Sequence, residues 1–249
     1  MDLAKTSVDR KRFFITGTGR SGSTLLAAIM ADAGADFDMN YRADWNPRSG
    51  AYEHQSALRA GIWFQRARKL EEAPLPNFLR IICERRSVHH LKKLLEKVRF
   101  VKTSKLIWLT QLTKRIGYSP VMIVSYRSFP GYVRSRYRRN GWSLPFLTET
   151  YYEIYSTALL ELGIFGGCAI DYEEMTNVAE TSWADVLAQV TGLSRDRLLE
   201  ARAKRLRPNK KPAAPLLFDP EPIDGRPQAV FKSLRNLKGK FIEPGQSGG

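Results

Sequence analysis

The stretch Phe13–Leu26, FFITGTGRSGSTLL, decides the fold that we predict for this chain. It begins within the apolar run Arg12–Thr16, which is typical of a short buried strand. Gly17 ends that run, and the following segment, Ser23–Ala33, is rich in helix formers and stops at Gly34, a residue typical of helix C-termini. We therefore expect a strand, a glycine-rich turn and a helix in direct succession. In this arrangement the backbone N–H groups of the turn and the helix N-terminus can bind an anionic phosphate.

The rest of the chain alternates between strand and helix patterns. Further strands are expected at 98–103, 120–126 and 168–171, of which PVMIVSY at 120–126 is the strongest because it is a continuous, β-branched run. Helices are expected at 51–70, 77–97, 107–116, 130–139, 146–162, 183–191, 196–205 and 228–237. The alternation predicts an α/β fold, a three-layer sandwich with a central parallel sheet. We expect a single domain over 1–249, with flexible ends at 1–11 and about 243–249.

The chain is strongly basic. It carries 40 Lys and Arg against 25 Asp and Glu, a formal net charge of +15. This charge favours a polyanionic partner, and composition leaves nucleic acid, an acidic membrane face, an anionic glycan and a phosphorylated ligand all open. The two cysteines, Cys83 and Cys168, lie in apolar runs and are expected to be buried, reduced thiols. No stretch approaches the roughly 20 apolar residues of a membrane helix, so we expect a cytoplasmic protein.

The glycine-rich turn fits the phosphate-binding template GxxxxGK[ST] with one departure. Gly17 and Gly22 take the two glycine positions and Thr24 takes the hydroxyl position, but Ser23 stands where the template has lysine. A kinase needs that lysine on the β- and γ-phosphates of ATP. The cation of this loop is instead Arg20, in the middle of the turn. The loop therefore predicts a phosphate site but disfavours ATP-dependent phosphoryl transfer.

A second motif follows the strongest strand, in the sequence IVSYRSFPGYVRS. Arg127 comes at the carboxyl end of the strand, where ligands of open α/β sheets bind. Ser135 comes eight residues later, about two turns into the next helix, so that both side chains can share one anion. A third motif, DYEEM at Asp171–Met175, follows the last predicted strand and contains Tyr172.

In this order the three motifs resemble the sulfotransferases that use 3′-phosphoadenosine 5′-phosphosulfate (PAPS). The resemblance covers about residues 13–193 and implies a P-loop NTPase-like sulfotransferase fold, with PAPS as co-substrate and 3′-phosphoadenosine 5′-phosphate (PAP) as product. It places the Arg127 and Ser135 pair on the 3′-phosphate and Tyr172 near the adenine. The donor-binding residues that it implies are Gly17, Thr18, Gly19, Arg20, Ser21, Gly22, Ser23, Thr24, Arg127, Ser135 and Tyr172.

The resemblance also implies catalytic groups. Arg20 is suited to the leaving 5′-phosphate, and Lys102, a strand-end lysine, to the bridging oxygen or the sulfonate. Many members have a histidine base two residues after that lysine, but this chain has Ser104 there. Other members use a glutamate after the first helix, which makes Glu53 our first candidate for the general base and His54 the second. Because cations around the donor replace a metal ion, we expect no metal dependence.

The predicted reaction moves a sulfuryl group to a hydroxyl, or an amine, of an acceptor that the sequence does not identify. A saccharide or a lipid-linked molecule fits the basic charge, and we also expect peripheral contact with an anionic surface. Two alternatives stay open: an ATP-dependent small-molecule kinase with a degenerate loop, and a basic nucleic-acid-binding module that uses the cations at 134–139 and 80–99. No nucleic-acid motif supports the second, so we expect no nucleic-acid partner. The sequence leaves the oligomeric state open.

Overall fold

The computed structural model describes residues 10–37, 54–71, 77–103, 109–206 and 221–245. Its centre is a sheet of four parallel strands in the order β2-β1-β3-β4. The strands are β1 (Lys11–Thr16), β2 (Phe100–Lys102), β3 (Ser119–Tyr126) and β4 (Gly167–Asp171). The predicted α/β class with a central parallel sheet is confirmed, and all four predicted strands are present.

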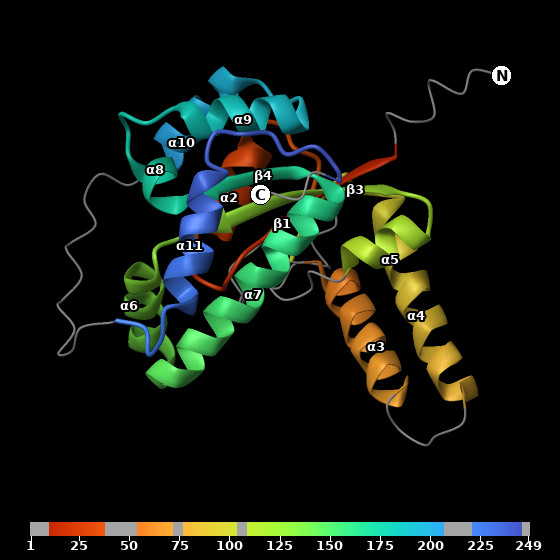
Figure 1. Ribbon diagram of the computed structural model, residues 1–249. Helices are drawn as coiled ribbons and strands as arrows, with labels where there is room; N and C mark the ends of the chain where they lie inside the picture. Colours follow the sequence, from red (N-terminus) through yellow and green to blue (C-terminus); the bar gives the residue numbers. More distant parts are fainter. Residues whose placement is uncertain (1–9, 38–53, 72–76, 104–108, 207–220, 246–249) are drawn as a thin grey trace.

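Helices cover both faces of the sheet, which gives the three layers seen in Figure 1. One face packs against α2 (Ser23–Asp32), α9 (Ser182–Thr191) and α10 (Arg195–Arg205). The other packs against α5 (Leu109–Arg115), α7 (Leu144–Phe165) and α11 (Arg226–Asn236). The remaining described helices are α3 (Gln55–Glu71), α4 (Asn77–Leu95), α6 (Phe129–Asn140) and α8 (Tyr172–Thr176).

Each strand buries side chains on both faces, which explains its nearly continuous apolar sequence. Because successive side chains of a strand point to opposite faces, Phe14 and Val124 belong to the core under α7, while Phe13 and Ile123 belong to the core under α2. Cys168 lies in the same core as Phe13. Burial raises the pKa of the Cys168 thiol to about 12, so this cysteine stays protonated. Neither cysteine of the chain forms a disulfide.

The structure moves several predicted boundaries and adds one element. Helix α7 begins at Leu144 and ends at Phe165, longer than the predicted 146–162, because Pro145 is favourable in the first turn of a helix and Gly166 ends it. The strand predicted at 98–103 is reduced to Phe100–Lys102. The short helix α8 was not predicted. It forms because the side chain of Asp171 accepts a hydrogen bond of 2.8 Å from the backbone N–H of Glu173.

The strand order creates a switch point between β1 and β3. From β1 the chain crosses to β2 on one side and then returns to pair β3 on the other side. Open α/β sheets bind ligands outside the carboxyl ends of the strands at such a point. The glycine-rich turn follows β1 and Arg127 follows β3, so both predicted anion-binding motifs lie at this place.

Two other features lie outside the three layers. Helices α3 and α4 pack on each other as a hairpin that extends away from the sheet in Figure 1. The C-terminal segment meets the edge strand β4, where Ile242 forms an antiparallel bridge with Gly167. The N–H of Gly245 donates to the carbonyl of Gly163, in the last turn of α7 (2.9 Å). Among the described helices, none is long and apolar enough to cross a bilayer.

Candidate functional site

The glycine-rich turn after β1 is packed against the end of β3. A Cβ at Gly17 would lie 2.6 Å from the Ser21 hydroxyl and would also collide with the carbonyl of Ser125, so no side chain fits there. The Ser125 hydroxyl donates to the carbonyl of Ser21 (2.9 Å). Gly22 has a φ of 93° and is the N-cap residue of α2, so its own side chain cannot cap the first N–H groups of the helix. The turn therefore presents the N-terminus of α2 at the switch point, as a phosphate-binding loop requires.

The structure brings the first two predicted motifs together. The Nε of Arg20 donates to the Oγ of Ser135, at 2.9 Å and across 115 residues of sequence. Arg20 is exposed and has a φ of 82°, in the left-handed region that residues other than glycine rarely occupy. The loop cation and the helix-α6 serine therefore lie in direct contact, which places the two motifs side by side.

The third motif adjoins the same site. The guanidinium of Arg127 lies 4.5 Å from the ring centroid of Tyr172, within the range of a cation–π interaction. The Nε of Arg127 also contacts the Oε1 of Glu173 at 3.2 Å, and the Ser128 hydroxyl donates to the same oxygen at 3.1 Å. A Cβ at Gly22 would overlap the Tyr172 ring, which shows that this ring lies on the N-cap of α2. The predicted 3′-phosphate residues and the predicted adenine contact thus lie beside the loop.

Sequence reasoning missed a further cation of the site, Arg136. Its guanidinium lies over Gly19, where any Cβ would collide with it, and 4.7 Å from the ring centroid of Trp142. The sequence placed Arg136 only among the cations of a hypothetical nucleic-acid patch. Its position next to Ser135 is a signal that could have found it, because a long side chain one residue from a site-facing serine can reach the same site.

Two tyrosines of α7 were also missed. Their hydroxyl groups contact the glycine-rich loop and the end of β3. The Tyr155 hydroxyl lies 3.1 Å from the Thr18 hydroxyl and donates to the carbonyl of Ser125 (3.1 Å). The Tyr151 hydroxyl donates to the carbonyl of Arg127 (2.7 Å). Burial raises the pKa of both phenols above the ordinary value, so both remain protonated donors. Tyr151 and Tyr155 are four residues apart, so they lie on the same side of a buried helix. Because a buried hydroxyl needs a hydrogen-bond partner, this spacing could have indicated that both contact the loop or the strand end.

The carboxyl ends of β1 and β2 carry buried polar groups. Lys102 is 2% exposed and pairs in register with Ile15. The hydroxyls of Thr16 and Thr103 are buried and have no hydrogen-bond partner within the described ranges. Because an unpaired buried hydroxyl costs about 1–3 kcal/mol, an acceptor such as a ligand oxygen would stabilise this edge.

Positive charge predominates over the loop. Three guanidinium groups, those of Arg20, Arg127 and Arg136, lie around it, and the carboxylate of Glu173 contacts one of them. A second carboxyl group, Asp171, caps α8 nearby. Burial, with Glu173 as a neighbour, raises the pKa of Asp171 to about 7, so this group carries little charge below neutral pH. The residues present therefore suit an anionic ligand.

The candidates for the general base are placed only in part. Glu53 and Ser104 lie outside the described residues. His54 is 1% exposed and directly precedes α3, and its carbonyl accepts the first-turn hydrogen bond from Leu58 (3.1 Å). The choice between Glu53 and His54 stays a prediction. Of the loop hydroxyls, Ser23 is buried and Thr24 is half-buried.

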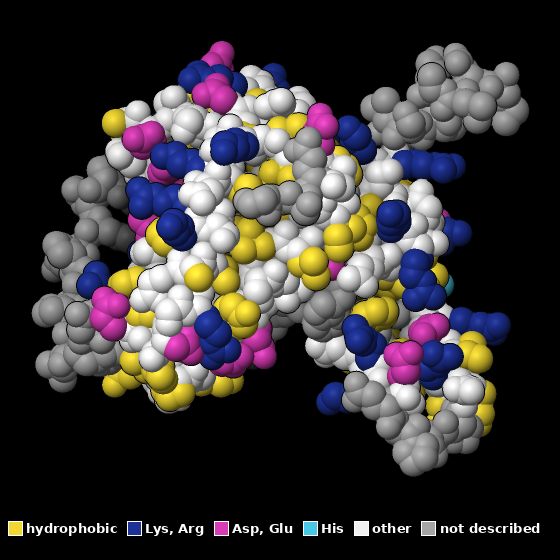
Figure 2. All heavy atoms as spheres, in the orientation of Figure 1, with side chains coloured by type: hydrophobic (Ala, Val, Ile, Leu, Met, Phe, Trp, Pro, Cys, Tyr) yellow, Lys and Arg dark blue, Asp and Glu magenta, His cyan; other side chains and the backbone are white. Residues whose placement is uncertain are grey.

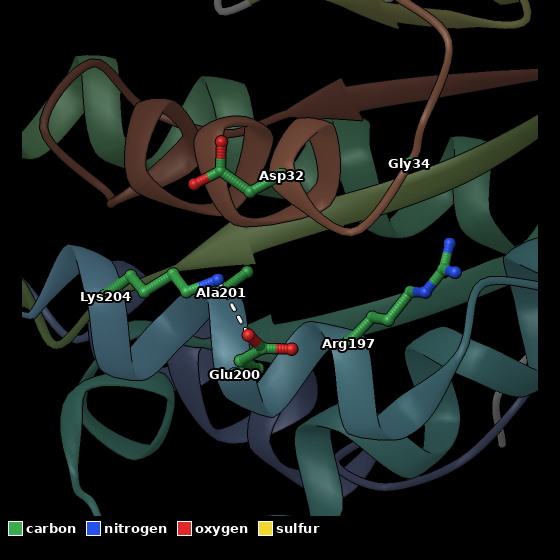
Figure 3. Close-up of a pocket in the computed structure, with 6 residues that line it drawn as sticks. All are labelled: Asp32, Gly34, Arg197, Glu200, Ala201 and Lys204. Carbon is green, nitrogen blue, oxygen red and sulfur yellow. Dashed lines mark ion pairs between the residues drawn. The ribbon is translucent and has the colours of Figure 1, made fainter.

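A hollow shown in Figure 3 lies away from this site, at the opposite end of α2. Its lining consists of Asp32, Gly34, Arg197, Glu200, Ala201 and Lys204. Lys204 pairs with Glu200 (2.7 Å), and Asp32 pairs with Arg205 (2.6 Å), which holds the pKa of Asp32 below its usual value. The carboxylates of Asp32 and Glu200 are thus paired with Arg205 and Lys204, two cations of α10, so these cations are already neutralised.

Comparison with known proteins adds no assignment. Searches against protein-family models, curated proteins and solved structures find no match to this chain. Within the described ranges, no group of three or more His, Cys, Asp or Glu side chains could hold a metal ion.

Proposed function

We propose that this protein is a PAPS-dependent sulfotransferase with a P-loop-like nucleotide site. It transfers a sulfuryl group to a hydroxyl or an amine of an acceptor, for which a saccharide or a lipid-linked molecule fits the basic charge of the chain. The observation that carries the proposal is the hydrogen bond between Arg20 and Ser135, 2.9 Å long, which joins two anion-binding motifs at the switch point of the sheet. A nucleotide with phosphates at both the 5′ and the 3′ position needs two such motifs side by side.

The described residues divide naturally between the two ends of this ligand. The turn at Gly17–Gly22 and the N-terminus of α2 bind the 5′-phosphate, and Arg20 neutralises the charge that develops on it. Arg127 and Ser135 bind the 3′-phosphate, and Tyr172 provides an aromatic face beside them. Lys102 contributes a further cation from the end of β2.

Sulfuryl transfer mainly requires that the donor and the acceptor are held in position and that the negative charge on the leaving phosphate is neutralised. When PAPS is bound, it supplies a sulfuryl group whose bond to the phosphate oxygen breaks as a bond to the acceptor oxygen or nitrogen forms. The proton of the acceptor passes to a general base, for which Glu53 and then His54 are the candidates. Arginines that hold both phosphates in place reduce the entropy cost of reaching the in-line geometry.

Ligand binding by the purified chain tests the proposal. Isothermal titration calorimetry with PAP, ATP and ATP with Mg²⁺ should give the tightest binding for PAP. Arg20→Ala and Arg127→Ala should each weaken PAP binding at least about tenfold, because each removes a charge-assisted hydrogen bond worth about 1.5–3 kcal/mol.

Arg197→Ala is the matched control, since Arg197 is an exposed arginine at the opposite end of α2. This variant should bind PAP as the wild type does. The proposal fails if ATP with Mg²⁺ binds more tightly than PAP, or if both loop and strand-end variants retain full affinity.

A further inference from the structure

The hairpin of α3 and α4 has an exposed face that the proposed enzyme site does not use. We define the hairpin face by Ile62, Trp63 and Arg66 from α3 and by Phe78, Ile82 and Arg86 from α4. The spacings of three and four residues place each set on one side of its helix. The guanidiniums of Arg66 and Arg86 lie 4.8 and 4.6 Å from the Trp63 ring centroid, so the two sets meet in one surface.

The apolar side chains of this face are exposed to solvent to an unusual extent. Phe78 is 57% exposed, Ile62 48% and Ile82 43%. The hairpin itself is held together elsewhere, by small residues such as Ala60 and Ser87, whose hydroxyl donates to the Ala60 carbonyl at 2.7 Å. Figure 1 shows the hairpin extending away from the sheet, and Figure 2 shows hydrophobic side chains exposed on it. The face is therefore free to meet a partner without unfolding.

The hairpin is also a concentrated source of positive charge. Its two helices carry nine Lys and Arg against two Glu, Glu71 and Glu84, and Glu71 pairs with Arg80 (3.6 Å). Figure 2 shows Lys and Arg side chains beside the hydrophobic ones. Cations that flank exposed aliphatic and aromatic side chains suit a surface with anionic head groups above an apolar layer.

We infer that the hairpin face binds an anionic lipid surface. Phe78 and Ile82 enter the head-group boundary, Trp63 lies at its level, and Arg66 and Arg86 contact lipid phosphates. The exposed aliphatic side chains favour lipid over nucleic acid or glycan, neither of which offers an apolar layer. The dense positive charge disfavours a second copy of the chain, because two such hairpins repel each other.

Vesicle co-sedimentation of the full chain tests this inference. The protein should bind vesicles that contain about a third phosphatidylserine at least tenfold more strongly than pure phosphatidylcholine vesicles, since each Lys or Arg near such a surface contributes about 1 kcal/mol. The double variant Phe78→Ser/Ile82→Ser and the double variant Arg66→Glu/Arg86→Glu should each lower this partitioning about tenfold or more.

Matched controls come from other exposed positions. Leu160→Ser/Ile164→Ser removes two exposed apolar side chains four residues apart on α7, and Lys232→Glu/Arg235→Glu reverses two exposed charges on α11. Both should bind vesicles within about twofold of the wild type. Circular dichroism melts verify that every variant is folded. In addition, brominated phosphatidylcholine should quench tryptophan fluorescence in the wild type and much less in Trp63→Phe.

Three results would overturn the inference. The first is unchanged vesicle binding by Phe78→Ser/Ile82→Ser with full competition by soluble heparin, which would mark a polyanion site. The second is a dimer in sedimentation equilibrium that this variant dissociates, which would mark an interface between copies. The third is an equal loss of vesicle binding in the α7 or α11 controls. None of these outcomes depends on PAP binding, so this inference and the proposed function can fail separately.

Discussion

Tyr155 connects the hydrophobic core to the glycine-rich loop through one hydroxyl group. That group contacts Thr18 in the loop and Ser125 at the end of β3. We expect Tyr155→Phe to lower the free energy of unfolding by about 1–3 kcal/mol, because it leaves buried polar groups without a partner, and to weaken PAP binding as the loop loosens. Urea denaturation and calorimetry measure the two effects. Tyr152→Phe, on the same helix but only partly buried, is the control and should change neither quantity.

Glu173 competes for the arginine that we assign to the 3′-phosphate. Its Oε1 accepts from both Arg127 and Ser128. Glu173→Gln keeps an acceptor oxygen but removes the negative charge, so we expect PAP to bind about fivefold more tightly, equivalent to about 1 kcal/mol for a charge pair near water. Calorimetry measures this, with Glu180→Gln as a control of equal charge change. Weaker binding in Glu173→Gln would mean that the carboxylate instead holds Arg127 in its binding position.

At the scale of single elements, helix α8 is capped at its N-terminus by the carboxyl group of Asp171, whose pKa is raised by burial. The folded-state pKa of Asp171, about 7, lies above the unfolded value of about 3.9, so its contribution to stability is full below pH 4 and is lost as the pH rises through 7. Asp171→Asn keeps the cap acceptor and cannot ionise. From pH 5 to pH 8, its stability relative to the wild type should rise by at least about 1.4 kcal/mol, the equivalent of one pKa unit.

Urea denaturation of both proteins at pH 5, 6.5 and 8 measures that difference, and other titrating groups cancel because the two proteins share them. A difference that stays constant across this range would contradict the expectation. Asp171 would then be ionised throughout.

The elements themselves were largely predictable from the sequence, whereas their contacts were not. The strands β1 and β3 were found because buried parallel strands read as continuous apolar runs, and the loop was found because Gly17 and Gly22 frame it. Helix α8 was missed because five residues carry too little periodicity to recognise. Arg136 and Tyr155 were missed as site residues because their partners in the loop are more than 100 residues away in the sequence. The local signals, a neighbouring serine and a four-residue spacing, do not say which distant segment such a side chain contacts.

For the whole molecule, the net charge of +15 should have two opposite consequences. Added salt screens the repulsion among the cations, so the ligand-free protein should melt at a higher temperature in about 0.5 M than in about 0.05 M potassium chloride. The same salt weakens the attraction between the site and a multiply charged anion, so PAP affinity should fall. Differential scanning calorimetry and titration calorimetry test the pair. A PAP affinity that does not respond to salt would place the ligand away from the arginines.

Residue 20 combines an arginine side chain with a backbone conformation that favours glycine, since its φ is 82°. Keeping a side chain there costs about 1–2 kcal/mol of local strain. Arg20→Ala and Arg20→Gly both delete the guanidinium, yet the glycine variant should be more stable than the alanine variant by about 1 kcal/mol in urea denaturation. Selection for thermal stability alone would therefore favour glycine at this position and remove the guanidinium from the proposed nucleotide site, so that stability would be gained at the expense of the proposed activity.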